Sequence, residues 1–243
     1  MSSDKKMTKK LVIIILVIIG VATLVSSGLI LWLPQVLDFL GPVPEFVEND
    51  WIELNKIANI SKYRSTIGHG YISADTSNKH YFQPYSCFAG TNDNVSVFAP
   101  VDLSVTGVRW GSNGINLSHI VTVDLKSNEH PSIAFVFFHL NIETSNLEVG
   151  QTLQAGQFLG YCDFANHGST DIAILRQPFF GATLSWFQLL TPDLMATYEN
   201  RGVTREKAIK TDAQVAESEA NGYSFSNSDP NDWITLNGTN PCP

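Results

Sequence analysis

The chain has 243 residues, of which 44% are hydrophobic and 16% charged, and it carries a formal net charge of −8 at pH 7. This acidic balance argues against a nucleic-acid partner, because phosphate backbones are bound by clustered Lys and Arg. The length suffices for one domain with a hydrophobic core and additional terminal segments.

An uncharged apolar run from Leu11 to Leu33 follows an N-terminal segment, residues 1–10, that contains four lysines. The run is long enough to cross a bilayer as a helix, which Pro34 is expected to end. The lysines place residues 1–10 in the cytoplasm and the remainder outside it. The alternative is a signal peptide cleaved near Ser27, but the apolar run continues past that site. We expect a single-pass membrane protein whose residues 11–33 contact the lipid bilayer.

The segment after this anchor, residues 34–63, is predicted to be a juxtamembrane stretch followed by a helix. Between Glu45 and Tyr63, the apolar residues recur at helical spacing. From Arg64 to Arg176 the chain consists of short β-branched or aromatic runs separated by Asn, Gly and Ser clusters. This pattern predicts a mainly β domain over residues 64–180, with an antiparallel β-sandwich or barrel-sandwich hybrid core.

The C-terminal extension, residues 181–243, has a different composition. Ser185 to Arg201 and Thr204 to Glu219 are predicted to be helices, and Trp233 to Leu236 a short strand within a loop-like end. A local basic cluster is expected to be the solvated face of a helix. Its members are Arg201, Arg205, Lys207 and Lys210.

Three cysteines, Cys87, Cys162 and Cys242, lie on the side of the anchor predicted to be exported, where disulfides persist. Three thiols allow one intrachain disulfide and leave one cysteine over. The sequence does not choose the pair.

The stretch from Phe135 to Arg176 contains FVFFHLN, LEVGQTLQAGQFLGYC and STDIAILR. It resembles the lysostaphin-type (LytM-like, duplicated hybrid motif) zinc metallopeptidases, in which a His-Leu pair ends a strand, a Gly-Gln hairpin follows and the last strand carries H-x-H. His139 matches the His-Leu histidine, and Gly150-Gln151 with Gly156-Gln157 match the hairpin. The resemblance extends over about Arg64 to Arg176.

In that family, zinc is held by the His and Asp of H-x-x-x-D and by the second His of H-x-H. His80 matches the first ligand, but Pro84 stands at the Asp position. Asp171 and Ala173 stand at the two positions of H-x-H, so the resemblance retains one of three zinc ligands. A catalytic zinc site needs three protein ligands and an open position. The resemblance therefore implies a divergent member without a cofactor and without ordinary zinc hydrolysis.

A rebuilt site is the sharper alternative. His69, His80, His139 and Asp171 would surround one groove if the resemblance holds, and His80, His139 and Asp171 could then bind zinc. Asp75 is a further candidate on the loop after His69. Against this, a carboxylate beside an imidazole is also the ordinary way to satisfy a buried histidine. The remaining histidines are expected on the solvated surface: His119, His130 and His167.

Together these patterns predict a membrane-anchored, extracytoplasmic peptidase-like domain that is non-catalytic. Its expected role is a binding or regulatory module of the cell envelope, with an envelope polymer or protein as its partner. The alternative is an active metallohydrolase that uses the rebuilt His/Asp site. A third interpretation is a purely structural scaffold whose groove is filled by its own side chains.

Overall fold

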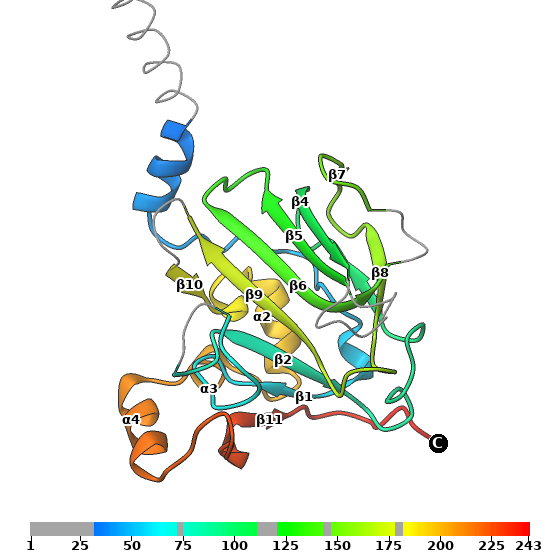
Figure 1. The fold of residues 1–243 in the computed structure, drawn as a ribbon, viewed down its shortest axis with the longest axis vertical. Helices are drawn as coiled ribbons and strands as arrows, with labels where there is room; N and C mark the ends of the chain where they lie inside the picture. The colour runs from blue at the N-terminus through cyan, green and yellow to red at the C-terminus, as the bar shows by residue number, and fades with distance from the viewer. Residues whose placement is uncertain (1–31, 72–74, 111–120, 143–146, 178–181) are drawn as a thin grey trace, which may run out of the picture.

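The computed structural model describes residues 32–71, 75–110, 121–142, 147–177 and 182–243. Its strands are β1 (Ile57–Ser61), β2 (Lys79–Pro84), β3 (Ser96–Phe98), β4 (Leu103–Trp110), β5 (Val121–Ser127), β6 (Ile133–Asn141), β7 (Thr152–Leu153), β8 (Phe158–Cys162), β9 (Thr170–Arg176), β10 (Ala182–Leu184) and β11 (Trp233–Thr235). Their main order in the sheet is β11-β1-β2-β9-β6-β5-β4-β7, as Figure 1 shows. All the strand pairs are antiparallel, so the predicted mainly β, antiparallel domain is confirmed.

The described strands belong to one hydrogen-bonded sheet, whereas a sandwich would have two separate sheets. Strand β6 is its central member and pairs with β5 and β9 along most of its length. At its end, Leu140 and Asn141 turn to a third partner, β8. Register shifts in the β4–β5, β5–β6 and β3–β8 pairs mark bulges. Because bulges bend a sheet, one continuous network can curve over itself.

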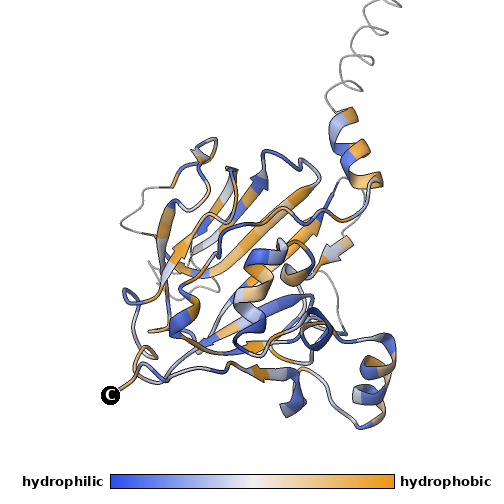
Figure 2. Ribbon diagram, turned by 180° about the vertical axis from the view of Figure 1, so that it is seen from behind, coloured by the Kyte–Doolittle hydropathy of each residue, from blue (hydrophilic) through white to orange (hydrophobic). Residues whose placement is uncertain are grey.

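One face of the sheet carries the hydrophobic core. Alternate residues of β6, namely Ile133, Phe135 and Phe137, are fully buried on this face. The Trp51 ring stacks on Phe137 with centroids 5.1 Å apart and meets Phe82 edge-on at 4.9 Å. Figure 2, seen from behind, shows α2 (Pro192–Glu199) lying over this face. The C-terminal extension therefore covers the core.

The predicted helix between Glu45 and Tyr63 is wrong. The segment is mostly extended, with a short 3₁₀ turn at Leu54–Lys56 before β1. The backbone N–H groups of Phe46 and Val47 both donate to the Leu189 carbonyl, at 2.9 and 3.0 Å. The apolar residues do recur at helical spacing, but the hydrogen bonds to the Leu189 carbonyl, far away in the sequence, hold the segment extended.

Residues 32–40 form a helix, drawn in blue above the domain in Figure 1. Pro34 lies inside it, so the prediction that this residue ends the helix is wrong. The predicted membrane segment falls outside the described residues except for Trp32 and Leu33. Within the described ranges, no helix is both long enough and apolar enough to traverse a bilayer.

The two predicted C-terminal helices are each divided. The first contains a 3₁₀ turn (Trp186–Gln188) before α2, and the second contains α3 (Arg205–Ala208) and α4 (Asp212–Ala220). The break falls at Ile209, which forms a parallel bridge with Tyr63, and Thr211 then caps α4. After a 3₁₀ turn (Pro230–Asp232), β11 confirms the predicted terminal strand.

Three residues of the basic cluster, Arg201, Arg205 and Lys210, are structural, and for them the expectation of a solvated helix face is wrong; Lys207 is exposed on α3, as expected. The Arg201 guanidinium donates to the carbonyls of Ile57 at 3.2 Å and Asn237 at 2.9 Å. Arg205 likewise donates to the Phe187 and Leu190 carbonyls. The buried Lys210 ammonium lies 2.7 Å from Asp232 Oδ1. These side chains satisfy backbone carbonyls and a buried carboxylate, which fixes the extension to the sheet.

The predicted single disulfide joins Cys87 to Cys242 across a sequence separation of 155 residues. It ties the C-terminal end of the chain to the loop after β2. Cys162 is free and buried in β8, and burial raises the pKa of its thiol. The left-over thiol is thus shielded from exchange.

Reduction of this disulfide should lower the free energy of unfolding by about 2 to 4 kcal/mol, because the bond restricts a long loop of the unfolded chain. Urea unfolding of the full chain with and without reductant measures the change. The double variant Cys87→Ser/Cys242→Ser should match the reduced protein and show no response to reductant. Equal stability of the oxidised and reduced wild type would contradict the expectation.

Candidate functional site

Two neighbouring strands bring a lysine and a carboxylate together on the face of the sheet opposite the core. In the β2–β9 pair, Lys79 stands beside Ala173 and Tyr81 beside Asp171. Paired residues of antiparallel strands project to the same side, so these four side chains share one face. Strand β6 continues the face on the other side of β9 through the Phe138–Asp171 pair.

Lys79 and Asp171 form a fully buried ion pair. The Lys79 ammonium lies 2.6 Å from Asp171 Oδ2, and both side chains are 0% exposed. The same ammonium lies 4.4 Å from the Phe138 ring centroid and 4.9 Å from that of Tyr81. These rings supply cation–π contacts in place of water.

Both members of this pair are held in their charged forms. Burial opposes ionisation of Asp171, yet the hydrogen bond from His139 and the charge of Lys79 keep the pKa of its carboxyl below the usual range. Burial likewise opposes protonation of Lys79, but the carboxylate of Asp171 raises the pKa of its ammonium above the ordinary value. The site therefore contains a permanent internal cation and anion.

His139 reaches Asp171 because β6 bulges at this point. Two residues of β6, Phe138 and His139, lie between the Phe137–Val123 and Leu140–Val121 pairs, where β5 has only Thr122. His139 takes the left-handed backbone conformation, with φ at 60°. The extra residue turns its imidazole so that Nε2 lies 3.1 Å from Asp171 Oδ1. The left-handed backbone conformation of His139, which is strained for a residue other than glycine, thus orients its side chain towards Asp171.

A second imidazole completes the cluster at the surface. The His167 ring stacks on His139 with centroids 3.8 Å apart and planes inclined by 25°. Burial, followed by the neighbouring His139, lowers the pKa of His167. Nδ1 of His139 and Nε2 of His167 have no hydrogen-bond partner among the described residues. His167 thus lies at the surface, as expected, but it is only partly exposed because its ring packs against His139.

The loop after β1 covers the other side of the ion pair. The Tyr81 hydroxyl accepts from the His69 backbone N–H and donates to the His69 carbonyl, both at 3.1 Å. Gly68 has a φ of 68°, and a Cβ there would stand 2.3 Å from the Tyr81 ring. Only glycine combines this conformation with such a close approach. The Tyr71 ring adds an edge contact to Phe138, at 5.3 Å.

His80 lies on the core side of the sheet, away from the other predicted site residues. Its Nδ1 lies 2.8 Å from the Ser61 carbonyl oxygen and its Nε2 lies 2.7 Å from Ser185 Oγ. Its ring also meets Phe187 edge-on at 5.0 Å. Burial lowers the pKa of His80 to about 4, so the imidazole is neutral at pH 7. Strand alternation explains the separation, since neighbours on β2 point to opposite faces.

The structure brings together His139 and Asp171, and it separates them from His69 and His80. The His69 side chain is exposed, with Nδ1 3.1 Å from the Gly70 carbonyl, and only its backbone reaches the cluster. The candidate Asp75 is also exposed. Across the described ranges, no group of three or more His, Cys, Asp or Glu side chains could hold a metal ion. The side-chain positions thus differ from the predicted zinc set of His80, His139 and Asp171.

The other predicted positions are accounted for in part. Pro84 ends β2 opposite Ile57, and Ala173 lies buried beside Lys79. His130 was expected at the solvated surface, but its Nδ1 lies 2.9 Å from Asp38 Oδ1 and its ring contacts Phe46. This expectation is wrong, because the imidazole packs against Phe46 and contacts Asp38 near the end of the helix at residues 32–40. His119 lies outside the described residues.

The sequence patterns did not predict three members of the cluster, namely Lys79, Tyr81 and His167. Lys79 directly precedes His80, and a strand that alternates could have assigned the two to opposite faces. Pairing that strand with the one containing Asp171 would have selected Lys79 and Tyr81. Nothing in the local sequence indicated that His167 would stack on His139.

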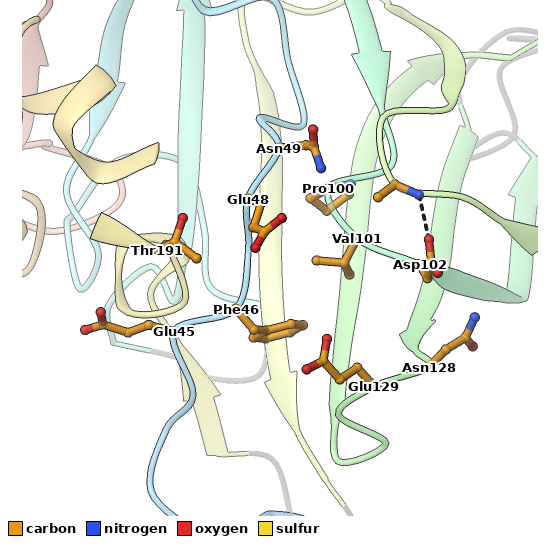
Figure 3. Close-up of a pocket in the computed structure, with 11 residues that line it drawn as sticks. Glu45, Phe46, Glu48, Asn49, Pro100, Val101, Asp102, Asn128, Glu129 and Thr191 are labelled. Atoms are coloured by element: carbon orange, nitrogen blue, oxygen red, sulfur yellow. Dashed lines mark hydrogen bonds between the residues drawn. The ribbon is translucent and has the colours of Figure 1, made fainter. Parts of the chain in front are cut away.

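A separate hollow of about 450 Å³ lies between residues 45–49 and the loops at residues 100–102 and 128–129 (Figure 3). Four carboxylates line it, those of Glu45, Glu48, Asp102 and Glu129. Asp102 accepts from the Ala155 N–H at 2.8 Å, and Glu45 lies 3.1 Å from the Arg205 guanidinium. None of the residues of the Lys79–Asp171–His139 cluster lines this hollow.

No family model matches the chain, and no curated protein matches it either. Solved structures do. Lysostaphin from Staphylococcus simulans shares 16% identity over 57% of this chain and 51% of that one, with a TM-score of 0.37. A variant catalytic domain of the prophage-encoded M23 protein EnpA from Enterococcus faecalis shares 13% over 60% and 95%, with a TM-score of 0.35. Helicobacter pylori Csd3 shares 11% over 79% and 46%, also with a TM-score of 0.35.

All three are distant likenesses, at 11 to 16% identity and TM-scores of 0.35 to 0.37. The matched region covers about half of the lysostaphin and Csd3 structures.

His80→Gln should flatten the pH dependence of stability. Unfolded, the imidazole takes up a proton below pH about 6.5, whereas the folded one does so only near pH 4. Between these values the unfolded state binds more protons, so the stability due to His80 is full above pH about 6.5 and is lost as the pH falls towards 4. The difference corresponds to about 3 kcal/mol. Urea unfolding at pH 7 and pH 4.5 measures it. His69→Gln is the exposed control, and an unaltered slope in His80→Gln would contradict the prediction.

Lys79→Met should lower the free energy of unfolding by about 3 to 5 kcal/mol, because it leaves the Asp171 carboxylate buried without its cation. Adding Asp171→Asn should recover most of that loss, since a neutral amide still accepts a hydrogen bond from His139. Denaturant unfolding of the two variants provides the comparison. Lys207→Met, at an exposed lysine, should change stability by less than about 0.5 kcal/mol. A Lys79→Met variant as stable as this control would refute the proposed pairing.

Proposed function

We propose that the chain is a membrane-anchored, extracytoplasmic, peptidase-like domain that does not hydrolyse peptides. In this proposal it acts as a binding or regulatory module of the cell envelope. The observation that carries the proposal is the buried contact between the Lys79 ammonium and Asp171, 2.6 Å apart, at the centre of the candidate site. The predicted anchor at residues 11–33 supports its placement at a membrane.

If Asp171 were a metal ligand, the ion would have to bind close to the Lys79 ammonium, which lies 2.6 Å from Asp171 Oδ2. Both carboxylate oxygens of Asp171 are already contacted, Oδ2 by Lys79 and Oδ1 by His139. A divalent cation about 4 Å from the ammonium would be repelled by roughly 8 kcal/mol at an effective dielectric constant of about 20. Ala173 offers no donor atom beside it. These contacts support a site closed to metal by its own internal cation.

The same contacts leave little scope for acid–base chemistry by Asp171 or Lys79. Each is fully buried and stabilised in its charged form by the other. A general base needs access to its substrate and a pKa near the working pH. The two residues therefore fit a structural role, namely to fix the orientation of His139.

His139 and His167 form the accessible edge of the cluster. The His139 side chain is 24% exposed, and His167 is partly exposed beside it. The two stacked imidazoles offer a partly exposed aromatic edge to a ligand, while His139 Nδ1 and His167 Nε2 are buried behind it. Such a surface suits a neutral or cationic group of an envelope peptide, in keeping with the acidic net charge of the chain.

The proposal predicts binding without cleavage. The full chain in detergent, supplied with zinc, should release no fragments from cross-linked peptidoglycan or from its peptides, as followed by chromatography. In a sedimentation assay, His167→Ala should weaken retention on the same insoluble peptidoglycan several-fold, while His69→Ala, at an exposed position beside the cluster, should not.

Two results would overturn the proposal in different ways. Zinc-dependent cleavage abolished by His139→Ala or Asp171→Ala would establish the metallohydrolase alternative. Absence of both cleavage and retention would favour the scaffold interpretation, in which the site serves only the stability of the fold.

A further inference from the structure

The helix formed by residues 32–40 is locked to the domain by two side chains. Asp38 Oδ2 accepts from the Ser132 N–H at 2.9 Å and from the Ser132 hydroxyl at 2.7 Å, while its Oδ1 lies 2.9 Å from His130 Nδ1. Arg176, the last residue of β9, donates to the carbonyls of Asp38 at 3.1 Å and Gly41 at 2.5 Å. The helix end is therefore fixed to the start of β6 and the end of β9.

The rest of the helix presents apolar side chains to the outside. Leu33, Leu37 and Leu40 follow the i, i+4, i+7 spacing that places them on one face. Their exposed fractions are 47, 60 and 72%, and Trp32 adds another exposed ring. Asp38 faces the domain from the opposite side of the helix. The chain thus exposes an apolar stripe on an element that it holds rigidly.

The preceding sequence identifies what covers this stripe. No charged residue occurs between Lys10 and Asp38. A helix crosses the roughly 30 Å hydrocarbon core of a bilayer with about 20 residues. An uncharged run that starts at Leu11 is longer than this, so its last residues would lie at the level of the lipid headgroups. A tryptophan such as Trp32 is typical of that level.

We propose that the helix at residues 32–40 rests its leucine stripe in the headgroup layer of a lipid bilayer and holds the domain at a fixed orientation to it. This inference depends on the proposed membrane anchor. The clamp of Asp38 and Arg176 makes the connection a stiff stalk, whereas an ordinary linker would let the domain rotate freely.

The orientation has a consequence for the site. Ser132 and Arg176 lie at the end of the sheet that carries the helix, as Figure 1 shows for the adjacent ends of β6 and β9. His139 lies six residues further along β6 than Ile133, which corresponds to about 20 Å at 3.3 Å per residue. The imidazole cluster therefore lies towards the end of β6 that is remote from the helix, where envelope polymers would reach it.

The test uses the full chain in phosphatidylcholine–phosphatidylglycerol vesicles with a nitroxide on a single introduced cysteine, since Cys162 is buried and the other two are paired. Leu37→Cys reports the stripe, Gln35→Cys the other side of the helix, and Asn128→Cys the domain. The ratio of relaxation by oxygen to relaxation by a water-soluble nickel complex should be several-fold higher for the Leu37 label than for either control label. Asp38→Ala/Arg176→Ala should sharpen the spectrum of the Leu37 label, because the released helix moves more freely.

Distinct outcomes separate the stalk from the anchor. A chain that does not float with the vesicles would refute the membrane anchor itself. A chain that floats, but whose Leu37 label is as accessible to nickel as the Asn128 label, would refute the stalk alone. Spin–spin broadening between Leu37 labels that disappears on dilution with unlabelled chain would show that a second copy covers the stripe, which also overturns the proposal.

Discussion

A lysine ammonium that is withdrawn from water must find a compensating charge, and this constraint organises the candidate site. Lys79 finds it in Asp171, at 2.6 Å, with both side chains fully buried. The contact exists only in the observed register of β2 and β9, which sets Tyr81 beside Asp171. A slip by one residue would direct Lys79 into the apolar core and His80 to the carboxylate. The ion pair therefore fixes the strand register as well as the chemistry of the site.

The second determinant is the bulge of β6 at His139. Without an extra residue there, strand alternation would continue and the imidazole would point to the core, as Phe137 does. The bulge brings His139 to Asp171 and against His167, at the point where β6 leaves β9 for β8. The bulge thus places His139, a residue of a strand that otherwise contributes to the core, at the edge of a partly exposed site. The buried pair beneath it holds the ring in place.

Much of this could be predicted from the sequence, and the failures have physical causes. The strand runs, the terminal strand and the proximity of His139 to Asp171 follow from local patterns and motif spacing. The role of Lys79 does not, because a lysine at the start of a strand is usually solvated and its partner lies 92 residues further along the chain. The helix expected between Glu45 and Tyr63 failed for a related reason, since the Leu189 carbonyl, far away in sequence, holds that segment extended.

We propose that the Lys79 ammonium occupies the position beside Asp171 that a bound metal ion would need. Zinc content measured by plasma mass spectrometry, after equilibration of the full chain with zinc and removal of the free ion, tests it most directly. The account predicts no stoichiometric zinc in the wild type and no change in Asp171→Asn. Stoichiometric zinc in the wild type that is lost in Asp171→Asn would contradict the account.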